Sequence, residues 1–397
     1  MKVRAVTGKN FGDEGKGLAV SSFAQKAAGS GKSCLVIRHN GGAQAGHTVE
    51  NERGRFVFHQ LSSGSLYGAD TLWSETYLPD LIKLGDELSE LEKSFGAEPA
   101  VYAYGSCRCT CILDIILNMA AESMRGSSRH GSCGMGINEC MRRSESFPLY
   151  LSDICGMTAD KLFSELERIR REYVPLRLEE LGISLSGSGD YTELLDDRTI
   201  LMNTAEIMCR NAENIRLMNN EAPLSYDEII FEGAQGLLLD SEYVKFAPHL
   251  TNSRTGSYNP VNFCRRHLPG QSLEIIYVTR TYVTRHGNGP LPYAGEFDAE
   301  SRNITDRTNI PNDWQGTLRF APHGTAEEFL EPVIQDMKNA EGTDFTASLM
   351  LTHIDETDGE VICSGGNIRA EVFLAQINER GIFDRIYRSA SRFGAEI

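Results

Sequence analysis

A glycine-rich segment near the amino terminus has the residue types that bind phosphate. The apolar residues 3–7 predict a short β-strand, and residues 18–26 predict a helix. Between them the chain runs through a glycine-rich turn from Gly8 to Lys16. Backbone amides at a helix N-terminus bind anions and a lysine adds a positive charge, so this order predicts a phosphate-binding loop. The alternative is a glycine turn that carries a solvated lysine.

This loop departs from the usual phosphate-loop pattern in two ways. The usual pattern has four residues between its glycines, whereas six separate Gly8 from Gly15. Gly17 also stands where a serine or threonine hydroxyl would normally contact Mg²⁺. Another residue must then supply oxygen to a metal ion, and Asp13 lies within the same loop.

The elements that must position this loop belong to an alternating pattern of strands and helices. A second strand is predicted at 34–38 and a third begins at Ile229, and each runs into a glycine-rich turn. Further strands are predicted at 275–280 and 348–352. Strands that alternate with helices predict an α/β fold with a mostly parallel central sheet flanked by helices. Ligands of such sheets bind beyond the carboxyl ends of the strands.

The overall composition excludes several classes of protein. The 397 residues include 39 Lys+Arg and 55 Asp+Glu, so the net charge of −16 argues against a general nucleic-acid binder. Without an apolar run of about 18 residues or a signal peptide, we expect no membrane span. Ten cysteines without a CxxC pair indicate reduced thiols in a cytoplasmic protein, and Cys107, Cys109 and Cys111 are expected to pack on one strand face. Because we find no repeat or clear linker, we expect one large domain over residues 1–397.

Five motifs, in order along the chain, resemble those of the adenylosuccinate synthetase family, whose members join IMP and aspartate at the expense of GTP. The motifs are GDEGKG (12–17), GGAQAGHT (41–48), FEGAQGLLLD (231–240), TRHGNGPLP (284–292) and LTHID (351–355). Each glycine-rich motif is weak evidence alone, and their shared order carries the resemblance. It implies a P-loop-related, mostly parallel sheet with helices on both sides, and a homodimer.

The chemistry of that family asks for particular groups. Replacing the 6-oxo group of a purine by an amine requires activation of the oxygen, most simply as a phosphate ester. The reaction needs a carboxylate that removes the N1 proton and a second group that neutralises charge between the γ- and β-phosphates. The resemblance assigns the first role to Asp13, the second to His47 and phosphate binding to Lys16. Asp13 and the Gly46 carbonyl would also bind Mg²⁺, and the product from IMP and L-aspartate would be N6-succinyl-AMP.

The remaining binding residues are carried over from matching positions. The resemblance assigns nucleoside triphosphate binding to Gly12, Asp13, Glu14, Gly15, Lys16, Gly17, Gly46, His47, Thr48, His353, Asp355, Ser389 and Ser391. It assigns purine nucleotide binding to Asp13, Gln44, Ala45, Ser132, Cys133, Arg143, Gln235, Thr251 and Arg319. It assigns aspartate binding to Thr317 and Arg319.

The chain departs from the family pattern around its specificity loops. Cys133 replaces a threonine that binds the substrate phosphate, and Ser132 is an alternative donor. A deletion leaves open whether Arg142 or Arg143 is the arginine that reaches into the site of the partner subunit.

The aspartate-binding loop is the most reduced of these segments. The family has a threonine-rich stretch followed by several arginines, of which Thr317 and Arg319 remain. A dicarboxylate needs at least one strong cationic partner, which Arg319 would provide with Arg280 and Arg285 as supplements.

Three alternatives therefore stay open at the level of sequence. His353 replaces the family lysine that holds guanine together with Asp355, so ATP is an alternative to GTP. A phage branch of the family aminates dGMP, but its members commonly carry a small residue in place of the catalytic aspartate, so Asp13 favours IMP. A non-catalytic nucleotide-binding protein is the third alternative, which the retained Asp13, Lys16 and His47 disfavour.

Overall fold

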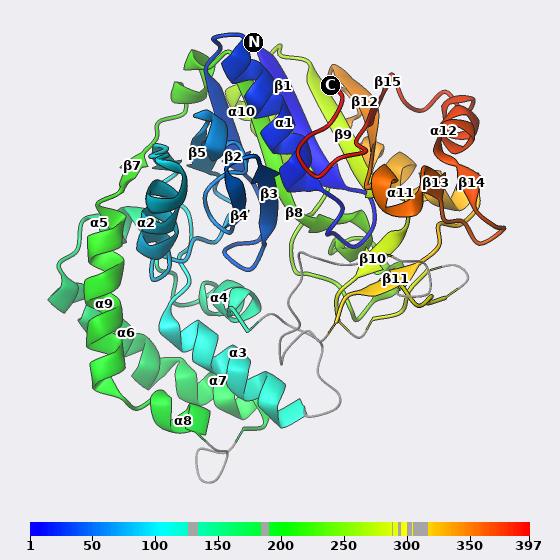
Figure 1. Cartoon of the computed structure of the whole chain (residues 1–397). Coiled ribbons are helices and arrows are strands. Elements are labelled where there is room, and N and C mark those ends of the chain that lie inside the picture. Colours follow the sequence, from blue (N-terminus) through cyan, green and yellow to red (C-terminus); the bar gives the residue numbers. More distant parts are fainter. Residues whose placement is uncertain (126–133, 184–189, 288, 293–294, 300–303, 305–316) are drawn as a thin grey trace.

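A long sheet forms the centre of the protein. The computed structural model (Figure 1) describes residues 1–125, 134–183, 190–287, 289–292, 295–299, 304 and 317–397. Within these residues nine strands form one sheet in the order β15-β12-β9-β1-β8-β2-β5-β6-β7, and every neighbouring pair is parallel. The predicted α/β fold with a mostly parallel sheet is therefore confirmed. The strands are β1 (Lys2–Gly8), β2 (Cys34–Arg38), β5 (Asp70–Trp73), β6 (Val101–Ala103), β7 (Ile215–Leu217), β8 (Glu228–Gly236), β9 (Leu273–Arg280), β12 (Phe345–Thr352) and β15 (Arg385–Arg388).

Helices cover both faces of this sheet, and for that reason its central strands are apolar along most of their length. One face packs on α1 (Lys16–Gly29), whose Ala19, Val20 and Phe23 share a buried cluster with Val6 and Ile230. The other face packs on helices from the second half of the chain, namely α10 (Tyr258–His267), α11 (Ala326–Met337) and α12 (Ala370–Asn378).

A group of helices lies beside the end of the sheet that carries β6 and β7 (Figure 1, lower left). Their apolar residues recur at helical spacing, as in α6, where Leu162, Leu166 and Ile169 are buried. Within the described residues, no helix is long and apolar enough to cross a membrane. The group comprises α2 (Leu84–Phe95), α3 (Ile112–Arg125), α4 (Ile137–Arg143), α5 (Leu151–Cys155), α6 (Ala159–Glu172), α7 (Val174–Leu181), α8 (Asp190–Leu194) and α9 (Arg198–Ala212).

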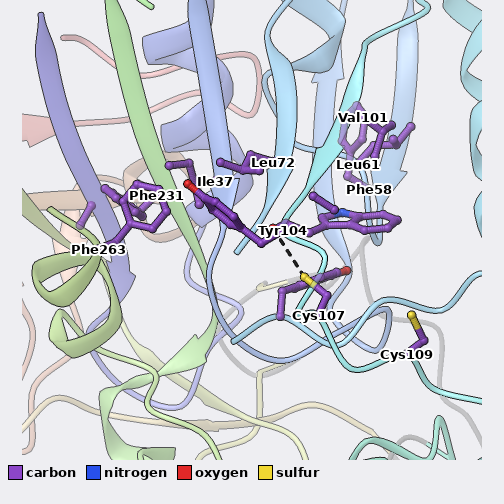
Figure 2. Close-up of a cluster of buried hydrophobic side chains, with 14 of the residues drawn as sticks. Ile37, Phe58, Leu61, Leu72, Val101, Tyr104, Cys107, Cys109, Phe231 and Phe263 are labelled. Atoms are coloured by element: carbon purple, nitrogen blue, oxygen red, sulfur yellow. Dashed lines mark hydrogen bonds between the residues drawn. The ribbon is translucent and has the colours of Figure 1, made fainter. Parts of the chain in front are cut away.

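The three alternating cysteines are buried, as expected, but they do not lie on a strand. The chain turns at residues 105–106, which ends β6, and Cys107, Cys109 and Cys111 follow in an irregular segment. Figure 2 shows Cys107 and Cys109 below the aromatic and aliphatic side chains that surround Tyr104. Burial raises the pKa of Cys107 to about 12, so this thiol packs in the core rather than reacting as a thiolate.

The loops that bear the predicted site residues meet at one edge of the sheet. Strands β12, β9, β1, β8 and β2 are consecutive neighbours and all parallel, so their carboxyl ends lie side by side. Two short antiparallel pairs begin near this edge and a third lies beside α12 (Figure 1). The pairs are β3 (His47–Asn51) with β4 (Gly54–Phe58), β10 (Val283–Arg285) with β11 (Arg319–Ala321), and β13 (Glu360–Val361) with β14 (Ile368–Arg369).

Candidate active site

A cavity of about 690 Å³ opens at the carboxyl edge of the sheet. The loop between β1 and α1 forms one part of its lining, and the segment between β2 and β3 forms another. Such a volume is typical of a small-molecule site. Most of the predicted site residues line it, namely Gly12, Asp13, Glu14, Gly15, Lys16, Gly17, Gln44, Ala45, Gly46, His47, Thr48, Gln235, Thr251 and His353.

The carboxylate of Glu14 holds the phosphate loop together from inside. One of its oxygens accepts from the backbone amide of Asn10 at 2.8 Å and from the Asn10 side chain at 2.7 Å. The other oxygen accepts from the backbone amide of Gly12 at 3.2 Å. Burial raises the pKa of Glu14 to about 7, although nearby Lys16 acts in the opposite direction. The close approach requires Gly8, because a Cβ atom there would lie 2.6 Å from Glu14.

Asp13 lies near the tip of this loop in a left-handed backbone conformation, with φ of 63°. Nε of Arg280 donates to its backbone carbonyl oxygen at 2.5 Å, and Nη2 of the same arginine lies 3.9 Å from the Asp13 carboxylate. Nε2 of His286 lies 3.5 Å from the same carboxylate oxygen. The Asp13 carboxylate is therefore presented to the cavity between two basic side chains.

Lys16 begins helix α1 and is almost completely buried. Burial lowers its pKa, and the charges of Glu14 and Asp13 oppose that shift. The next residue explains why the usual hydroxyl is missing from this loop. A Cβ atom at Gly17 would lie only 3.1 Å from Cβ of His47. The start of β3 therefore packs closely against the first turn of α1, which favours a glycine at residue 17.

His47 is paired with a carboxylate that lies within the FEGAQGLLLD motif but was assigned no role from the sequence. Its Nδ1 lies 2.7 Å from Oε1 of Glu232, which is fully buried in β8. Ser63 donates to the same carboxylate from its backbone amide at 3.1 Å and from its hydroxyl. Burial would raise the pKa of Glu232, but His47, Arg38 and Ser63 together outweigh burial and lower it to about 2. Burial lowers the pKa of His47 to about 4, although Glu232 opposes this shift.

These two pKa values define the state of the pair before a ligand binds. At neutral pH Glu232 is ionised and His47 is neutral. Nδ1 of His47 therefore carries the ring proton and donates a hydrogen bond to Glu232. Nε2 is then an acceptor and becomes a donor only when the ring gains a second proton. The negative charge of a triphosphate would favour the doubly protonated ring. His47 can therefore become a proton donor when phosphates arrive in the cavity.

Two glutamine side chains were predicted to bind the purine nucleotide. Gln44 and Gln235 both line the cavity, and neither side-chain carbonyl oxygen has a hydrogen-bond partner within the described residues. Gln235 has a φ of 64° at the carboxyl end of β8, where the chain turns. Thr251 lines the cavity from the segment that follows β8. Ser132 and Cys133, also expected here, lie outside the described residues.

The predicted aspartate-binding residues do not line the cavity. Thr317 is exposed, next to residues 314–316, which lie outside the described part of the chain. Nη2 of Arg319 donates to the backbone carbonyl oxygens of Gly287, at 2.6 Å, and of Gly289. The guanidinium of Arg319 is therefore engaged with the backbone that follows β10.

Arg285 lines the cavity, as Arg280 does. Its guanidinium lies 4.2 Å from the centre of the Phe11 ring, and Nη1 donates to the carbonyl oxygen of Pro290 at 2.6 Å. Burial, followed by the charge of Arg319, lowers the pKa of Arg285 to about 10. Nη2 donates to the carbonyl oxygen of His249 at 3.2 Å, and Nε is buried without a hydrogen-bond partner within the described residues.

Of the residues predicted to bind the nucleobase of the triphosphate, one lines the cavity and one lies at the surface. His353 lines the cavity, and its Nδ1 lies 2.8 Å from the hydroxyl of Thr352. Burial lowers the pKa of His353 well below its usual range, so the ring is neutral. Asp355 is exposed in the turn that follows.

The carboxyl-terminal segment contributes an arginine next to the two predicted serines. Ser389 is buried, and its hydroxyl donates to the backbone carbonyl oxygen of Ser391 at 2.9 Å, so it shapes the segment itself. Ser391 is exposed. Arg392 lines the cavity and forms an ion pair with Glu50 of β3 at 3.2 Å.

Arg143 points away from the cavity and is fully buried. Its Nε and Nη2 donate to the two carboxylate oxygens of Asp114, each at 2.8 Å. Its remaining donors reach backbone carbonyl oxygens of Phe147 and Cys109. Arg142 is exposed. The structure therefore uses Arg143 to join α3 and α4, and Arg142 is the surface arginine of the two.

The cavity offers oxygen atoms that suit Mg²⁺. The Asp13 carboxylate and the backbone of Gly46 both line it. Within the described residues, no group of three or more His, Cys, Asp or Glu side chains could hold a metal ion. Mg²⁺ is commonly held by one or two carboxylates together with substrate phosphates, and Asp13 fits that arrangement.

Several residues at this site were assigned no role from the sequence, although they lie within or beside the motifs. Glu232 lies in FEGAQGLLLD and carried a signal, because an acidic residue inside an apolar strand needs a buried partner. His286 occupies a variable position of a motif, and Arg392 ends the segment 389–392, which resembles the family only loosely, so neither had a usable signal. Four polar residues line the cavity from the region of α3 and α4, namely Asn118, Glu122, Asn138 and Glu139.

Comparison of the sequence with known proteins identifies a single family. A sequence model described as "Adenylosuccinate synthetase" matches residues 5–309. The chain is 29% identical over 326 residues to the adenylosuccinate synthetase of Thermoplasma acidophilum, covering 76% of this chain and 66% of that protein. It is 28% identical over 376 residues to the adenylosuccinate synthetase of Shewanella piezotolerans, covering 91% of this chain and 79% of that protein.

Two solved structures are similar to the fold. The fully ligated adenylosuccinate synthetase of Plasmodium falciparum gives a TM-score of 0.66 at 18% identity, covering 91% of this chain and 79% of that chain. The succinoaminodeoxyadenylate synthetase of cyanophage S-2L, bound to dGMP and to dATP as an energy donor, gives a TM-score of 0.60 at 12% identity. That match covers 100% of this chain and 95% of the cyanophage chain. At these identities the similarity establishes the fold.

Proposed function

Because this chain belongs to the adenylosuccinate synthetase family of carbon–nitrogen ligases, as the match over residues 5–309 shows, we propose that it is an active ligase of this kind. In the proposed reaction a nucleoside triphosphate phosphorylates O6 of IMP, and L-aspartate displaces the phosphate to give N6-succinyl-AMP. One observation carries the proposal. Asp13, Lys16 and His47 line the same cavity, and they are the carboxylate, the phosphate-binding cation and the proton donor that the reaction needs.

The movement of protons and of the phosphoryl group follows from these residues. Asp13 takes the proton from N1, O6 attacks the γ-phosphorus, and the bond to the bridging oxygen of the triphosphate breaks. His47, once protonated, donates from Nε2 to the phosphate oxygens on which negative charge grows. Lys16 and the loop amides hold those phosphates. The amine of L-aspartate then attacks C6, and inorganic phosphate leaves.

Mg²⁺ would neutralise charge on the β- and γ-phosphates when it is bound. The Asp13 carboxylate and the Gly46 carbonyl would hold it together with phosphate oxygens. Since Asp13 is the one carboxylate in this set, the metal would depend on the nucleotide for its remaining ligands.

IMP is the proposed acceptor, and dGMP is the alternative. Asp13 supports IMP, because members of the phage branch commonly carry a small residue at this position, which leaves room for the 2-amino group. The cyanophage protein is bound to dGMP, and its similarity to this chain extends over the whole chain. This similarity supports the alternative.

GTP is the proposed phosphoryl donor, and ATP is the alternative. Asp355 favours guanine, but His353 stands where the family has a lysine, and the cyanophage protein binds dATP as its energy donor. L-aspartate is the proposed amine. Arg285 supports it, because a dicarboxylate needs a cation and the Arg285 side chain lines the cavity, where it also donates to the backbone carbonyl oxygens of Pro290 and His249.

We further propose a single-domain cytoplasmic protein that works as a homodimer. Arg142 is exposed, whereas Arg143 is buried against Asp114, so Arg142 is the residue that would reach the partner subunit. A non-catalytic nucleotide-binding protein is a further alternative. The retained Asp13, Lys16 and His47 argue against it, because binding alone requires neither a base nor an acid.

A matrix of substrates tests these assignments together. The purified protein is incubated with Mg²⁺, L-aspartate, either GTP or ATP, and either IMP or dGMP, while phosphate release and product mass are followed. We expect N6-succinyl-AMP from IMP with GTP, and a strongly reduced rate for the control variant His47→Asn. A product from dGMP alone would replace IMP as the acceptor. Nucleotide binding without a product in any combination would refute the ligase and leave the non-catalytic alternative.

A further inference from the structure

We propose that Arg280 is a positioning residue that holds Asp13 in place for proton removal. Through Tyr282 and Glu356 it also links Asp13 to the donor turn, residues 353–358, which follows β12. This role rests on the proposed function, in which Asp13 is the general base that removes a proton. It also takes the donor turn as the place where the purine ring of the nucleoside triphosphate binds.

The backbone of Asp13 has a φ of 63°, in the left-handed region, which aspartate adopts more readily than most residues other than glycine, and two side chains hold it there. Nε of Arg280 donates to the Asp13 carbonyl oxygen at 2.5 Å. The hydroxyl of Thr284 donates to the preceding carbonyl oxygen, that of Gly12, at 3.0 Å. Arg280 is the last residue of β9, and Thr284 lies in β10. The tip of the phosphate loop is therefore fixed from outside the loop.

The other side of the Arg280 guanidinium faces a tyrosine and a second carboxylate. Nη1 donates to the hydroxyl oxygen of Tyr282 at 2.9 Å and lies 3.7 Å from Oε2 of Glu356. The Tyr282 hydroxyl in turn donates to the same Glu356 oxygen. Arg280 is 3% exposed, so a cation almost removed from water is held between Asp13 and Glu356. Loss of the contact with one carboxylate would therefore change the position of the guanidinium relative to the other carboxylate.

Glu356 belongs to a turn that also contacts the phosphate loop. The hydroxyl of Thr352, just before the turn, donates to the carbonyl oxygen of Glu14 at 2.9 Å. The hydroxyl of Thr281 donates to the carbonyl oxygen of His353 at 3.2 Å, and His353 lines the cavity. A nucleotide that binds against His353 therefore touches the element that carries Glu356, which in turn orients Arg280 toward Asp13.

A purely structural ion pair is the competing explanation, and the variant Arg280→Lys separates the two. Lysine keeps the charge but cannot bond Asp13 and Tyr282 at once as the forked guanidinium does. We expect kcat to fall about 10- to 100-fold, with the KM values for both nucleotides changed by less than about threefold.

The matched control for this variant is Arg4→Lys at the opposite edge of the sheet. Arg4 also lies between two carboxylates, with Nη1 2.6 Å from Glu228 and Nε 3.1 Å from Glu274, and its guanidinium lies 4.6 Å from the centre of the Phe23 ring. We expect the control to leave kcat within about twofold of the wild type. An equal loss of kcat in the two variants would overturn the proposal.

The link to the donor turn is tested with Glu356→Gln. It should lower kcat, and the double variant with Arg280→Lys should lose no more than the more damaging single variant, because both act through one guanidinium. For Tyr282→Phe, which removes the hydroxyl of the link, the matched control is Tyr226→Phe, since the Tyr226 hydroxyl donates to Asp70 at 2.7 Å away from the cavity. Losses that add in the double variant would overturn the link.

A measurement without substrates keeps the test independent of catalysis. Hydrogen exchange of the peptide that covers residues 9–15 should be faster in Arg280→Lys and Glu356→Gln than in the wild type or Arg4→Lys. Unchanged exchange in both variants would overturn the positioning role. If the wild type has no activity with any pair of nucleotides, the proposed function fails, whereas this exchange comparison still decides whether Arg280 and Glu356 hold the loop.

Discussion

Replacing Glu232 by glutamine should make His47 a much poorer proton donor. Nδ1 of His47 lies 2.7 Å from the buried carboxylate of Glu232, which acts as the counter-charge when the ring becomes an imidazolium. Glutamine has nearly the same shape, so the substitution removes the negative charge and preserves the packing in β8.

The size of this effect follows from the strength of a charged hydrogen bond. Such a bond contributes about 1.5–3 kcal/mol, and about 1.4 kcal/mol corresponds to one pKa unit. The pKa of His47 in the nucleotide complex should therefore fall by about 1–2 units. Because burial already lowers the pKa of the ligand-free ring to about 4, little protonated His47 would remain at neutral pH. We expect kcat to fall about 10- to 100-fold.

The assay is the pH dependence of kcat at saturating nucleotide, measured for the wild type, Glu232→Gln and the control Ser63→Ala. A general acid must be protonated, so kcat falls as the pH rises through the pKa of His47 in the complex. This descending limb should move to lower pH in Glu232→Gln. Ser63→Ala keeps the carboxylate and should move the limb less. An unmoved limb with kcat within about threefold of the wild type would refute the reasoning.

Three further predictions concern other groups. Asp13→Asn should lower kcat by about 10²–10⁴-fold in initial-rate assays, as expected for loss of a positioned base, and near-normal turnover would exclude Asp13 from that role. Asp114→Asn leaves the buried Arg143 without its counter-charge. It should reduce the free energy of unfolding, measured in urea, by about 3–5 kcal/mol. A loss below about 1 kcal/mol would contradict a buried ion pair between Arg143 and Asp114. Burial lowers the pKa of His39 to about 3 from its unfolded value near 6.5, so the folded chain binds fewer protons and this residue makes the wild type less stable as the pH falls. His39→Gln removes that term, and its free energy of unfolding minus that of the wild type should rise by about 2 kcal/mol between pH 7 and pH 5; a constant difference would show that His39 protonates in the folded protein.

The parts of the site that could be predicted from sequence are those with a local pattern. The phosphate loop is a strand, a glycine turn and a helix within a short stretch of chain, and His47 follows the next predicted strand. The partner of His47 could not be predicted in this way. Glu232 lies 185 positions further along the chain, and only the strand order of the sheet brings β8 close to the start of β3.

Other features depended on which way a side chain points. Successive residues of a helix differ in direction by about 100°, so Arg142 and Arg143 cannot both face the same side of α4. Their positions do not reveal which one is buried, because that depends on Asp114 from α3. The alternating Cys107 and Cys109 had the period of a strand, but the chain turns before them and ends β6, so burial was predicted correctly and the element was not.

The close packing at Gly17 restricts how this loop can change by mutation. In an ordinary phosphate loop the residue after the lysine carries a hydroxyl to the metal. A serine at position 17 would have its Cβ 3.1 Å from Cβ of His47, from Oγ of Ser63 and from the carbonyl oxygen of Thr48, so these neighbours would have to shift by a few tenths of an ångström. The hydroxyl and the histidine therefore compete for space at this position. A single substitution that restores the hydroxyl would press on His47 and on Ser63, both of which contact Glu232.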